Sequence, residues 1–479
     1  MSQAEHASTS VAQRFPARHL PPPQLRDLPP APTRLGPIIG PGIVAAGVGL
    51  ASGEFIIYPY IASQVGLVFV WAALVGLVTQ FFINMEIERY TLATGETVLT
   101  GFSRLWKHWG LVFAAMAYLA NLWPGWVTSS ATIVTYLVGG SVTPIAIGML
   151  VAIGAVLTLA PVVYVALEKI EMVKVAAVLL LVAVGATFAI TSSAWGDVPQ
   201  VVTQATVPTE ALAFPVLLSA LAFAGAGGGQ NLCQSNWIRD KGFGMGAYVP
   251  RIVSPLTGQP EAAPSTGYVF EPTAENLSRW RGWWRTANVE QLVTFVLISF
   301  VTIFFTSMLA YATVFGRPGL ENGISFLQAE GEALKQSVGN WFGTFFWVIG
   351  AISLFAAALG IVDYTSRLAA DVLRVNYLKG ASESTVYAAL VWGLVVLGSA
   401  ILLVGFAQPL ALIVISACVG GFMMFIYSGL LAVLNRRALP REIRPRGYRV
   451  AVLVWSVLLF GTLSVLTIRH QYLTNIAGG

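Results

Sequence analysis

Long apolar runs recur along the chain, separated by short segments that are rich in polar residues, glycine and proline. Each run is about as long as a helix that crosses the hydrocarbon of a bilayer, which needs roughly 20 mainly apolar residues. The strands of an outer-membrane barrel would instead be about 10 residues long with alternating polarity, and no such alternation is present. Eleven runs are centred near 36–65, 67–88, 110–138, 143–163, 170–191, 211–238, 287–315, 341–366, 385–404, 408–434 and 449–468. The pattern predicts an all-α polytopic membrane protein with eleven transmembrane helices.

Composition supports this fold class. The 479 residues are 56% hydrophobic and 10% charged, with a mean hydropathy of +0.73, far from the balance of a soluble globular domain. Both cysteines, Cys233 and Cys418, fall within predicted spans, so no disulfide framework is expected.

The positions of Lys and Arg test the segmentation independently, because cytoplasmic loops collect positive charge. With the N-terminus in the cytoplasm and the C-terminus outside, only Arg317, Lys335 and Arg469 of the 27 Lys and Arg fall outside cytoplasmic segments. Lys169 and Lys174 are counted among the cytoplasmic residues. The net charge of +5 therefore reflects topology in the cell membrane, and no nucleic-acid partner is implied.

Residues 1–35 are Pro-rich and polar, lack the apolar core of a signal peptide, and are expected to form a disordered cytoplasmic tail before the transmembrane domain, 36–479. The cytoplasmic loop 239–286 is unusually long. Its "SRWRGWWRTAN" stretch has the Trp and Arg content of a membrane-surface helix.

Two spans are interrupted by glycine-rich breaks: the first reads "GPGIVAAGVGLASGEFIIYPY" and the sixth "FPVLLSALAFAGAGGGQNLCQSN". Matched broken helices in two halves indicate the midplane site of a secondary transporter. We therefore predict a five-plus-five inverted repeat with repeat one at about 36–192, repeat two at about 211–435, and an extra helix at about 449–468. The alternative is that the glycines merely allow close helix packing.

Five motifs follow one another along the membrane domain: "GPGIVAAGVGLASGEFIIYPYIASQVGLVFVWAAL", "ERYTLATGETV", "GGQNLCQSN", "GIVDYTSRLAADVL" and "PLALIVISACVGGFMMFIYSGLLAVLNRR". In these motifs and their order the chain resembles the Nramp family of divalent metal-ion transporters, within the amino acid-polyamine-organocation superfamily. The resemblance implies secondary transport of a metal ion around the two breaks.

The sequence departs from the family at the residues that carry its chemistry. Ala51 and Glu54 stand where the family has its metal-binding Asp and Asn, and Gly228-Gly229-Gln230-Asn231 stands in place of Met-Pro-His-Asn. The thioether that favours transition metals is therefore missing. The third span also lacks the carboxylates that the family uses to move protons.

Glu54 is the principal candidate residue, because a charge at membrane depth is costly unless it is compensated. It could bind an ion, with a metal ion as one candidate, at the break beside Gly53. The other ligands would be the free carbonyls of Leu50, Ala51, Gly227 and Gly228 and the side-chain amides of Gln230 and Asn231. Such an all-oxygen set suits Mg²⁺, Ca²⁺, Mn²⁺ or an alkali cation. Glu54 could instead carry a proton, or cap the outer half-helix.

Other polar residues have a structural and a functional interpretation. Cys233 is a possible soft ligand, but a lone buried Cys is more often a packing residue. Asn121 could line a cavity or join helices. Asp363, Arg367 and Asp371 could form a gate or an intrahelical ion-pair ladder, and Glu86, Glu88 and Arg89 are interpreted as ion pairs at a helix end.

The sequence thus predicts a secondary transporter that moves a cation, with a divalent metal ion as the first candidate, by alternating access. The alternatives are a transporter of an organic solute such as an amino acid, and a non-transporting sensor with the same fold. No enzyme motif such as His-Glu-x-x-His is present. We expect no cofactor, and as partners only an ion or small-molecule substrate and the lipid bilayer.

Overall fold

The computed structural model describes residues 11–32, 40–160, 162–250, 266–320 and 323–477. Within these ranges the chain is a bundle of helices with one pair of short parallel strands, β1 (Gln24–Leu25) and β2 (Tyr268–Val269). The helices are α1 Val11–Arg14, α2 Pro41–Gly49, η1 Gly53–Ile57, α3 Tyr58–Val65, α4 Trp71–Thr94, α5 Val98–Leu105, α6 Trp109–Asn121, α7 Gly125–Val138, α8 Val142–Leu159, α9 Val163–Phe188, α10 Ser192–Gly196, α11 Gln200–Thr203, α12 Phe214–Ala222, α13 Gly229–Lys241, η2 Gly244–Tyr248, α14 Ala274–Glu290, η3 Gln291–Leu297, α15 Ile298–Val314, α16 Ser325–Ser337, α17 Asn340–Asn376, α18 Glu383–Leu403, α19 Pro409–Ala438, η4 Arg441–Ile443 and α20 Tyr448–Ala477.

The described residues contain nine helical stretches that are long and apolar enough to cross a membrane. Two of the eleven predicted spans, 67–88 and 211–238, are not among them. The first corresponds to α4, whose polar side chains lower its hydropathy, and the second is divided into the short helices α12 and α13. The all-α membrane fold is confirmed, whereas the count of eleven stays a prediction.

Both predicted helix breaks are present. The first span consists of α2 and, after a short interruption, the π-helix η1 and α3. The sixth span stops at Ala222 and resumes at Gly229. Proline at the first helical position starts α2, where its missing N–H costs nothing. Non-helical backbone inside a membrane protein is tolerated where it is buried in protein, and both breaks are buried.

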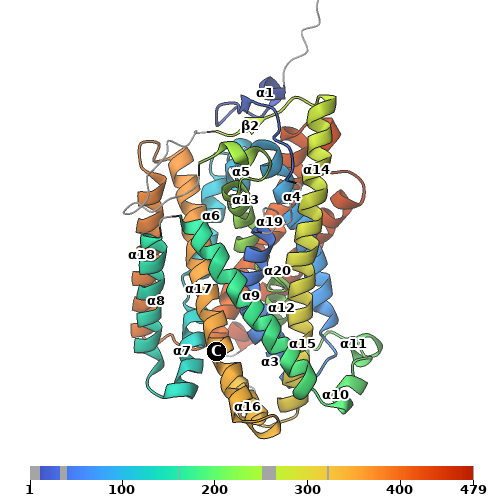
Figure 1. Ribbon diagram of the computed structural model, residues 1–479, viewed down its shortest axis with the longest axis vertical. Helices are drawn as coiled ribbons and strands as arrows, with labels where there is room; N and C mark the ends of the chain where they lie inside the picture. Colours follow the sequence, from blue (N-terminus) through green and yellow to red (C-terminus); the bar gives the residue numbers. More distant parts are fainter. Residues whose placement is uncertain (1–10, 33–39, 161, 251–265, 321–322, 478–479) are drawn as a thin grey trace, which may run out of the picture.

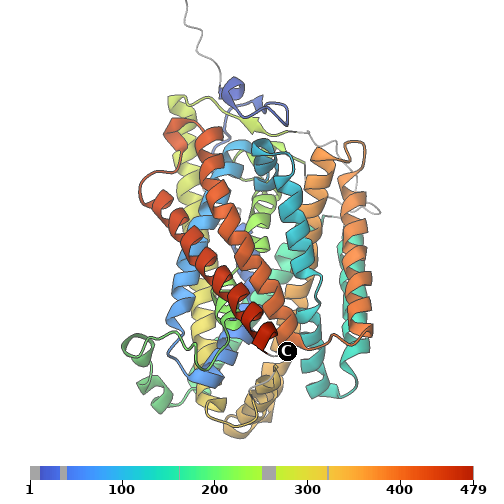
Figure 2. The ribbon, with the colours of Figure 1, turned by 180° about the vertical axis from the view of Figure 1, so that it is seen from behind.

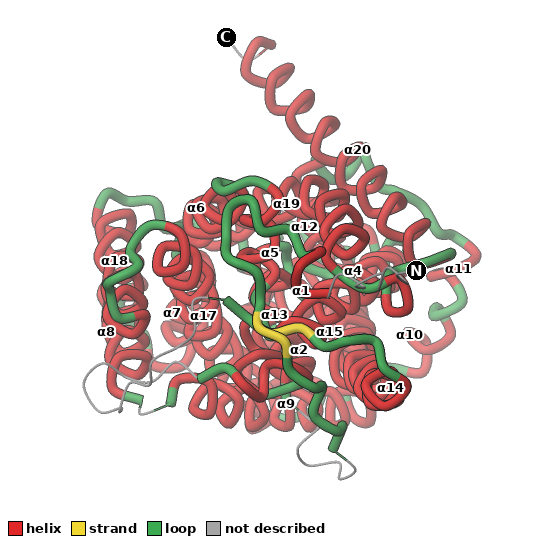
Figure 3. Tube along the Cα trace, turned by 90° about the horizontal axis from the view of Figure 1, so that it is seen from above, coloured by secondary structure: helices red, strands yellow, loops and turns green. Residues whose placement is uncertain are grey.

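The bundle is elongated, and the first described helix lies at the opposite end from the end of α20 (Figures 1 and 2). We call these the α1 end, which also holds α5, β2 and the start of α14, and the α16 end, which holds α10 and α11 (Figure 1). Viewed along the bundle, α8 and α18 pack together at one edge, while α20 projects outwards beside α19 (Figure 3).

The expectation of a disordered N-terminal tail is wrong for residues 11–32, the part of it that the structure describes. Phe15 and Leu28 are buried, and β1 pairs with β2. Trp283 Nε1 donates a hydrogen bond to the Pro29 carbonyl at 2.8 Å. Proline removes donors but leaves carbonyl acceptors, and here those acceptors fasten the segment to the bundle.

The Trp- and Arg-rich stretch is also placed differently from the prediction of a membrane-surface helix. It forms α14, which continues through η3 into α15 as one long helix (Figure 1). The hydroxyl of Thr273 caps α14 by accepting from the Asn276 amide at 3.2 Å. Trp280 and Trp283 are buried against neighbouring segments instead of facing lipid headgroups.

Candidate functional site

The two helix breaks touch each other through their backbones. A Cβ atom added to Gly49 would lie 1.8 Å from the carbonyl oxygen of Gly225, and one added to Gly53 would lie 1.9 Å from that of Phe223. Only glycine permits such an approach. The glycines of the first span therefore allow the interruptions of spans one and six to come into backbone contact.

The triple glycine forms the turn between α12 and α13. Gly227 and Gly228 both have φ of +81°, a region that other L-residues rarely adopt. The Gly228 amide donates to Asn231 Oδ1 at 2.8 Å, and the Tyr427 hydroxyl donates to the Gly228 carbonyl at 3.1 Å. Gly228 also lies against the backbone of Gly420 on α19. The break is thus a fixed feature of the packing.

Glu54 lies in η1 and is fully buried. Neither carboxyl oxygen has a hydrogen-bond partner among the described residues. Its backbone carbonyl accepts from Thr306 Oγ1 on α15 at 2.5 Å. The Ser299 hydroxyl and backbone groups of Ala51 and Glu54 are near enough to interact with the carboxylate, but none forms a hydrogen bond of normal geometry with it. No such hydrogen bond therefore supports the interpretation of Glu54 as a helix cap.

A buried ion pair lies beside this carboxylate. Lys174 Nζ is 2.7 Å from Glu171 Oε2, with both side chains on α9 and almost fully buried. Glu171 packs against Gly47 of α2 and Gly360 of α17. The charges of Lys174 and Glu54 are close enough to interact. The assignment of Lys174 to a cytoplasmic loop is therefore wrong, and a Glu and a Lys three residues apart in an apolar run were the available signal.

The other predicted ligands have partners of their own. The Leu50 carbonyl accepts from Ser353 Oγ at 2.7 Å, and the carbonyls of Ala51, Gly227 and Gly228 each accept a hydrogen bond, so none is free as predicted. Gln230 Nε2 donates to the Ala45 carbonyl at 2.5 Å and joins α13 to α2. Within the described residues no hydrogen bond connects Glu54 with Gln230 or Asn231.

Asn121 and Cys233 take structural places. Asn121 donates to Thr365 Oγ1 at 3.0 Å and accepts from Ser416 Oγ at 3.2 Å, so it connects three helices and borders a small cavity of about 20 Å³. Cys233 is a free, buried thiol. In the described ranges no group of three or more His, Cys, Asp and Glu residues is placed to hold a metal ion.

Ion pairs close the bundle towards the α1 end. Arg367 contacts Asp363 one turn earlier on α17, at 2.9 Å, and also Asp240 of α13, with all three fully buried. The intrahelical ion pair between Asp363 and Arg367 is as predicted, whereas Asp371 does not contact Arg367. It accepts instead from Arg239 of α13 at 2.8 Å.

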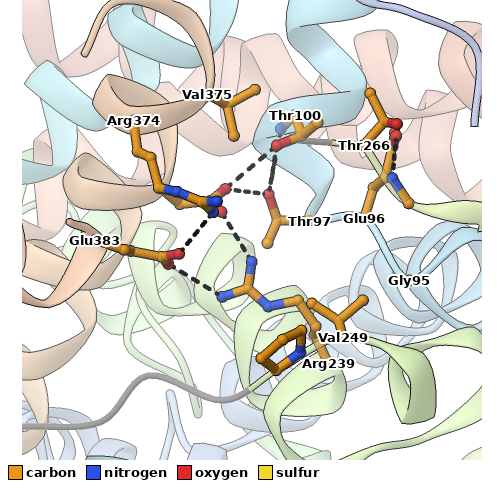
Figure 4. Close-up of a pocket in the computed structure, with 13 residues that line it drawn as sticks. Gly95, Glu96, Thr97, Thr100, Arg239, Val249, Thr266, Arg374, Val375 and Glu383 are labelled. Carbon is orange, nitrogen blue, oxygen red and sulfur yellow. Dashed lines mark hydrogen bonds and ion pairs between the residues drawn. The ribbon is translucent and has the colours of Figure 1, made fainter. Parts of the chain in front are cut away.

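Arg239 is the centre of a second cluster, which lines a small pocket of about 30 Å³ (Figure 4). Its guanidinium contacts Asp371 and, at 3.5 Å, Glu383 on α18. Thr97 Oγ1 donates to Asp371 at 2.5 Å from the start of α5. Helices α5, α13, α17 and α18 are thereby tied together, which makes this cluster a candidate gate.

Glu96 and Arg104 attach the N-terminal segment next to this pocket. Arg104 contacts Glu96 at 2.5 Å and donates to the carbonyls of Pro16 and Pro21, each at 3.0 Å. Burial disfavours the charged form of Glu96, but the charge and hydrogen bonds of Arg104, with those from Tyr90 and the Gly267 amide, lower its pKa. This ion pair is therefore kept ionised.

Comparison with known proteins gives a fold and no family. No family model and no curated protein matches the chain. Among solved structures it is similar to a mutant of the Eremococcus coleocola manganese transporter (9% identity, 94% of this chain and 90% of that chain, TM-score 0.69). It is also similar to MhsT in complex with L-phenylalanine (13%, 93% and 99%, 0.53) and to the nucleobase-cation-symport-1 family transporter Mhp1 (12%, 93% and 95%, 0.52). The chain therefore has the all-α fold of these membrane proteins, with the first and sixth spans interrupted.

Proposed function

We propose that the protein is a secondary transporter that moves a cation across the cell membrane by alternating access around the breaks of spans one and six. The observation that carries the proposal is the buried Glu54 carboxylate, which has no hydrogen-bond partner, in a break that touches the other break. A carboxylate at membrane depth without partners indicates an ion or substrate pathway. The manganese transporter among the structural neighbours supports a cation as cargo.

The donor set favours a hard cation. Glu54 supplies one carboxylate, and the Leu50 and Gly228 carbonyls and Asn231 Oδ1 lie at the two breaks, each accepting a hydrogen bond. Mg²⁺, Ca²⁺ and Mn²⁺ accept such ligands, whereas Zn²⁺ and Fe²⁺ prefer imidazole or thiolate. For such an ion to bind, the carbonyls would exchange or share their present hydrogen bonds, which is expected of a transporter that moves between conformations.

The second candidate is an organic solute with both charges, such as an amino acid. The Lys174 ammonium lies close to Glu54, so a positive and a negative group stand side by side at the first break and could bind a carboxylate and an ammonium group. When it is charged, Lys174 also repels a metal ion. Two structural neighbours are complexes or transporters of organic compounds, L-phenylalanine and bromovinylhydantoin.

Uptake into liposomes tests both candidates. Purified protein is reconstituted and the entry of Mn²⁺, Mg²⁺ and Ca²⁺ is followed with entrapped indicators, in parallel with entry of radiolabelled amino acids. Wild type is compared with Glu54→Gln and with Glu332→Gln, a control that removes a half-exposed carboxylate on α16. The proposal expects cation uptake that Glu54→Gln abolishes and Glu332→Gln retains. Uptake of amino acids alone would establish the second candidate, and no uptake of either class would contradict both.

A further inference from the structure

A line of polar side chains runs along α4 away from the helix break. Gln80, Asn84 and Glu88 are spaced four residues apart, so they lie on one face of the helix, and all three are buried. Gln80 Nε2 donates to the carbonyls of Leu221, Ala222 and Ala224 at 2.9–3.1 Å, and its Oε1 accepts from the Ala226 amide. The line therefore begins at the break between α12 and α13.

The middle and far end of the line contact α13. Asn84 Oδ1 accepts from Asn231 Nδ2 at 2.7 Å, and Glu88 Oε1 accepts from Gln234 Nε2 at 2.9 Å. Glu88 is therefore not one of the helix-end ion pairs predicted from the sequence. Glu86 and Arg89 do form such a pair, at 2.7 Å.

A second buried carboxylate, Glu290, interacts with Glu88 from the end of α14. Its Oε1 accepts from the backbone amides of Gly42 at 2.8 Å and Gly40 at 3.3 Å, at the start of α2. Its Oε2 is 3.4 Å from Gln291 Nε2. Glu290 thus holds the first half of the broken first span, while Glu88 is connected to the second half of the broken sixth span.

Neither carboxylate forms an ion pair with a basic residue among the described part of the chain. The charged groups on the neighbouring elements have other partners. Lys241 of α13 contacts Glu168 of α9 at 2.5 Å, Arg89 contacts Glu86 on α4, and Arg449 of α20 lies 3.4 Å from Glu86. Asp240 of α13 contacts Arg367 of α17. The Tyr164 hydroxyl of α9 is the exception, because it has no hydrogen-bond partner among the described residues and is close enough to interact with Glu290.

The cluster has more acceptors than donors. Glu88 Oε2, Gln234 Oε1 and Gln291 Oε1 are buried oxygens without a hydrogen-bond partner in the described residues, against two unpartnered donors, Asn84 Nδ2 and the Tyr164 hydroxyl. Two ionised carboxylates in such a place would repel each other and pay the cost of desolvation. A bound positive charge that also supplies a donor resolves both deficits, and a single proton does so without any other ligand.

We propose that Glu88 binds one proton, near the negative charge of Glu290, and is the coupling-ion site of the transporter, a role that rests on the proposed function. With the proton bound, Glu88 is neutral and its carboxyl group can donate a hydrogen bond, while Glu290 keeps the start of α2 in place. Loss of the proton leaves two negative charges that repel each other, which favours separation of α2 and α14 from α4 and entry of water at the α1 end. Proton release and opening are then linked, each favouring the other.

Infrared spectroscopy of the full-length protein in lipid tests the site without requiring transport. The difference spectrum between wild type and Glu88→Gln at neutral pH is expected to contain the carbonyl band of a protonated carboxyl group. Glu290→Gln, which keeps an acceptor for the Gly42 amide, is the second variant. It is expected to remove this band or change the pH at which the band disappears, while Glu332→Gln leaves the band unchanged.

Three outcomes would overturn the proposal. The first is a difference spectrum that contains only ionised carboxylate bands. The second is a carbonyl band of the protonated carboxyl group that vanishes when NaCl or MnCl₂ replaces choline chloride. The site would then bind a metal ion in place of the proton. The third is a band that neither variant changes. A band that behaves as expected in a protein without any uptake would support the proton site while contradicting the transport function.

Discussion

The Cβ position of Gly49 lies 1.8 Å from the carbonyl oxygen of Gly225, so the two interrupted helices are in direct backbone contact. This contact fixes where the unpartnered carboxylate of Glu54 stands relative to the sixth span. It also makes the architecture of the site sensitive to a single methyl group.

Replacement of Gly49 by alanine is expected to destabilise the protein by about 1 to 3 kcal/mol, the range for an added group that cannot be accommodated in a packed interior. Here the obstacle is backbone, which moves less easily than a side chain. Thermal unfolding in detergent measures the change. Gly148→Ala on α8 is the control, since nothing lies within 4 Å of its added methyl group. Equal melting temperatures for the two variants would contradict the contact.

Replacement of Lys174 by methionine should be more damaging, because it leaves Glu171 as a buried charge without its partner. Breaking such a pair costs about 3 to 5 kcal/mol. Adding Glu171→Gln to Lys174→Met should recover most of the loss, since the remaining charge is then removed. Melting temperatures of the two single variants and the double variant measure the coupling. Additive losses would show that the two side chains do not act as a pair.

Arg239 is expected to keep the α1 end closed. Cys233 is fully buried on α13, six residues before Arg239, and reports on opening when Cys418 is replaced by alanine. Arg239→Gln loosens the contacts to Asp371 and Glu383, so a maleimide should label Cys233 faster than in the parent protein. Lys335→Gln at the α16 end serves as the control. Identical labelling rates in all three proteins would exclude Arg239 from the gate.

Glu330 on α16 is expected to make the free energy of unfolding depend on pH. Burial raises its pKa well above the usual 4.5. The unfolded chain therefore loses this proton at lower pH than the folded protein, and stability falls as pH rises from about 4.5 towards the folded pKa. Glu330→Gln should be more stable than wild type near neutral pH and show a flatter pH profile, whereas Glu332→Gln should not. A steeper profile in Glu330→Gln would reverse the sign of this argument.

Patterns that depend on local residue types were readable from the sequence. Three consecutive glycines before Gln230 predict a break because no helix interior tolerates them cheaply. Asp363 and Arg367 predict an ion pair from their spacing alone. The fold followed from the positions of two such breaks, which the apolar runs locate.

Contacts between helices that are distant in the sequence could not be predicted from the sequence. The partners of Glu88 and Glu290 lie 146 and 248 residues away along the chain, so the sequence offered only the local, helix-end interpretation of Glu88. Lys174 was counted as a loop residue although its pairing with Glu171, three residues earlier, was visible in the sequence; only its proximity to Glu54 depends on the folded bundle. Residues 11–32 are structured because individual backbone carbonyls in them accept hydrogen bonds from Arg104 and Trp283. Amino-acid composition does not reveal such hydrogen bonds.

The most direct test of the central claim is accumulation against a gradient. Liposomes containing wild type or Glu54→Gln are loaded with Mn²⁺ at the external concentration, and a pH difference is then imposed across the membrane. Coupled transport predicts that wild type raises internal Mn²⁺ above the external level and that Glu54→Gln does not. Internal Mn²⁺ that stays at the external level in wild type, while the protein is folded and correctly inserted, would contradict proton-coupled cation transport at this site.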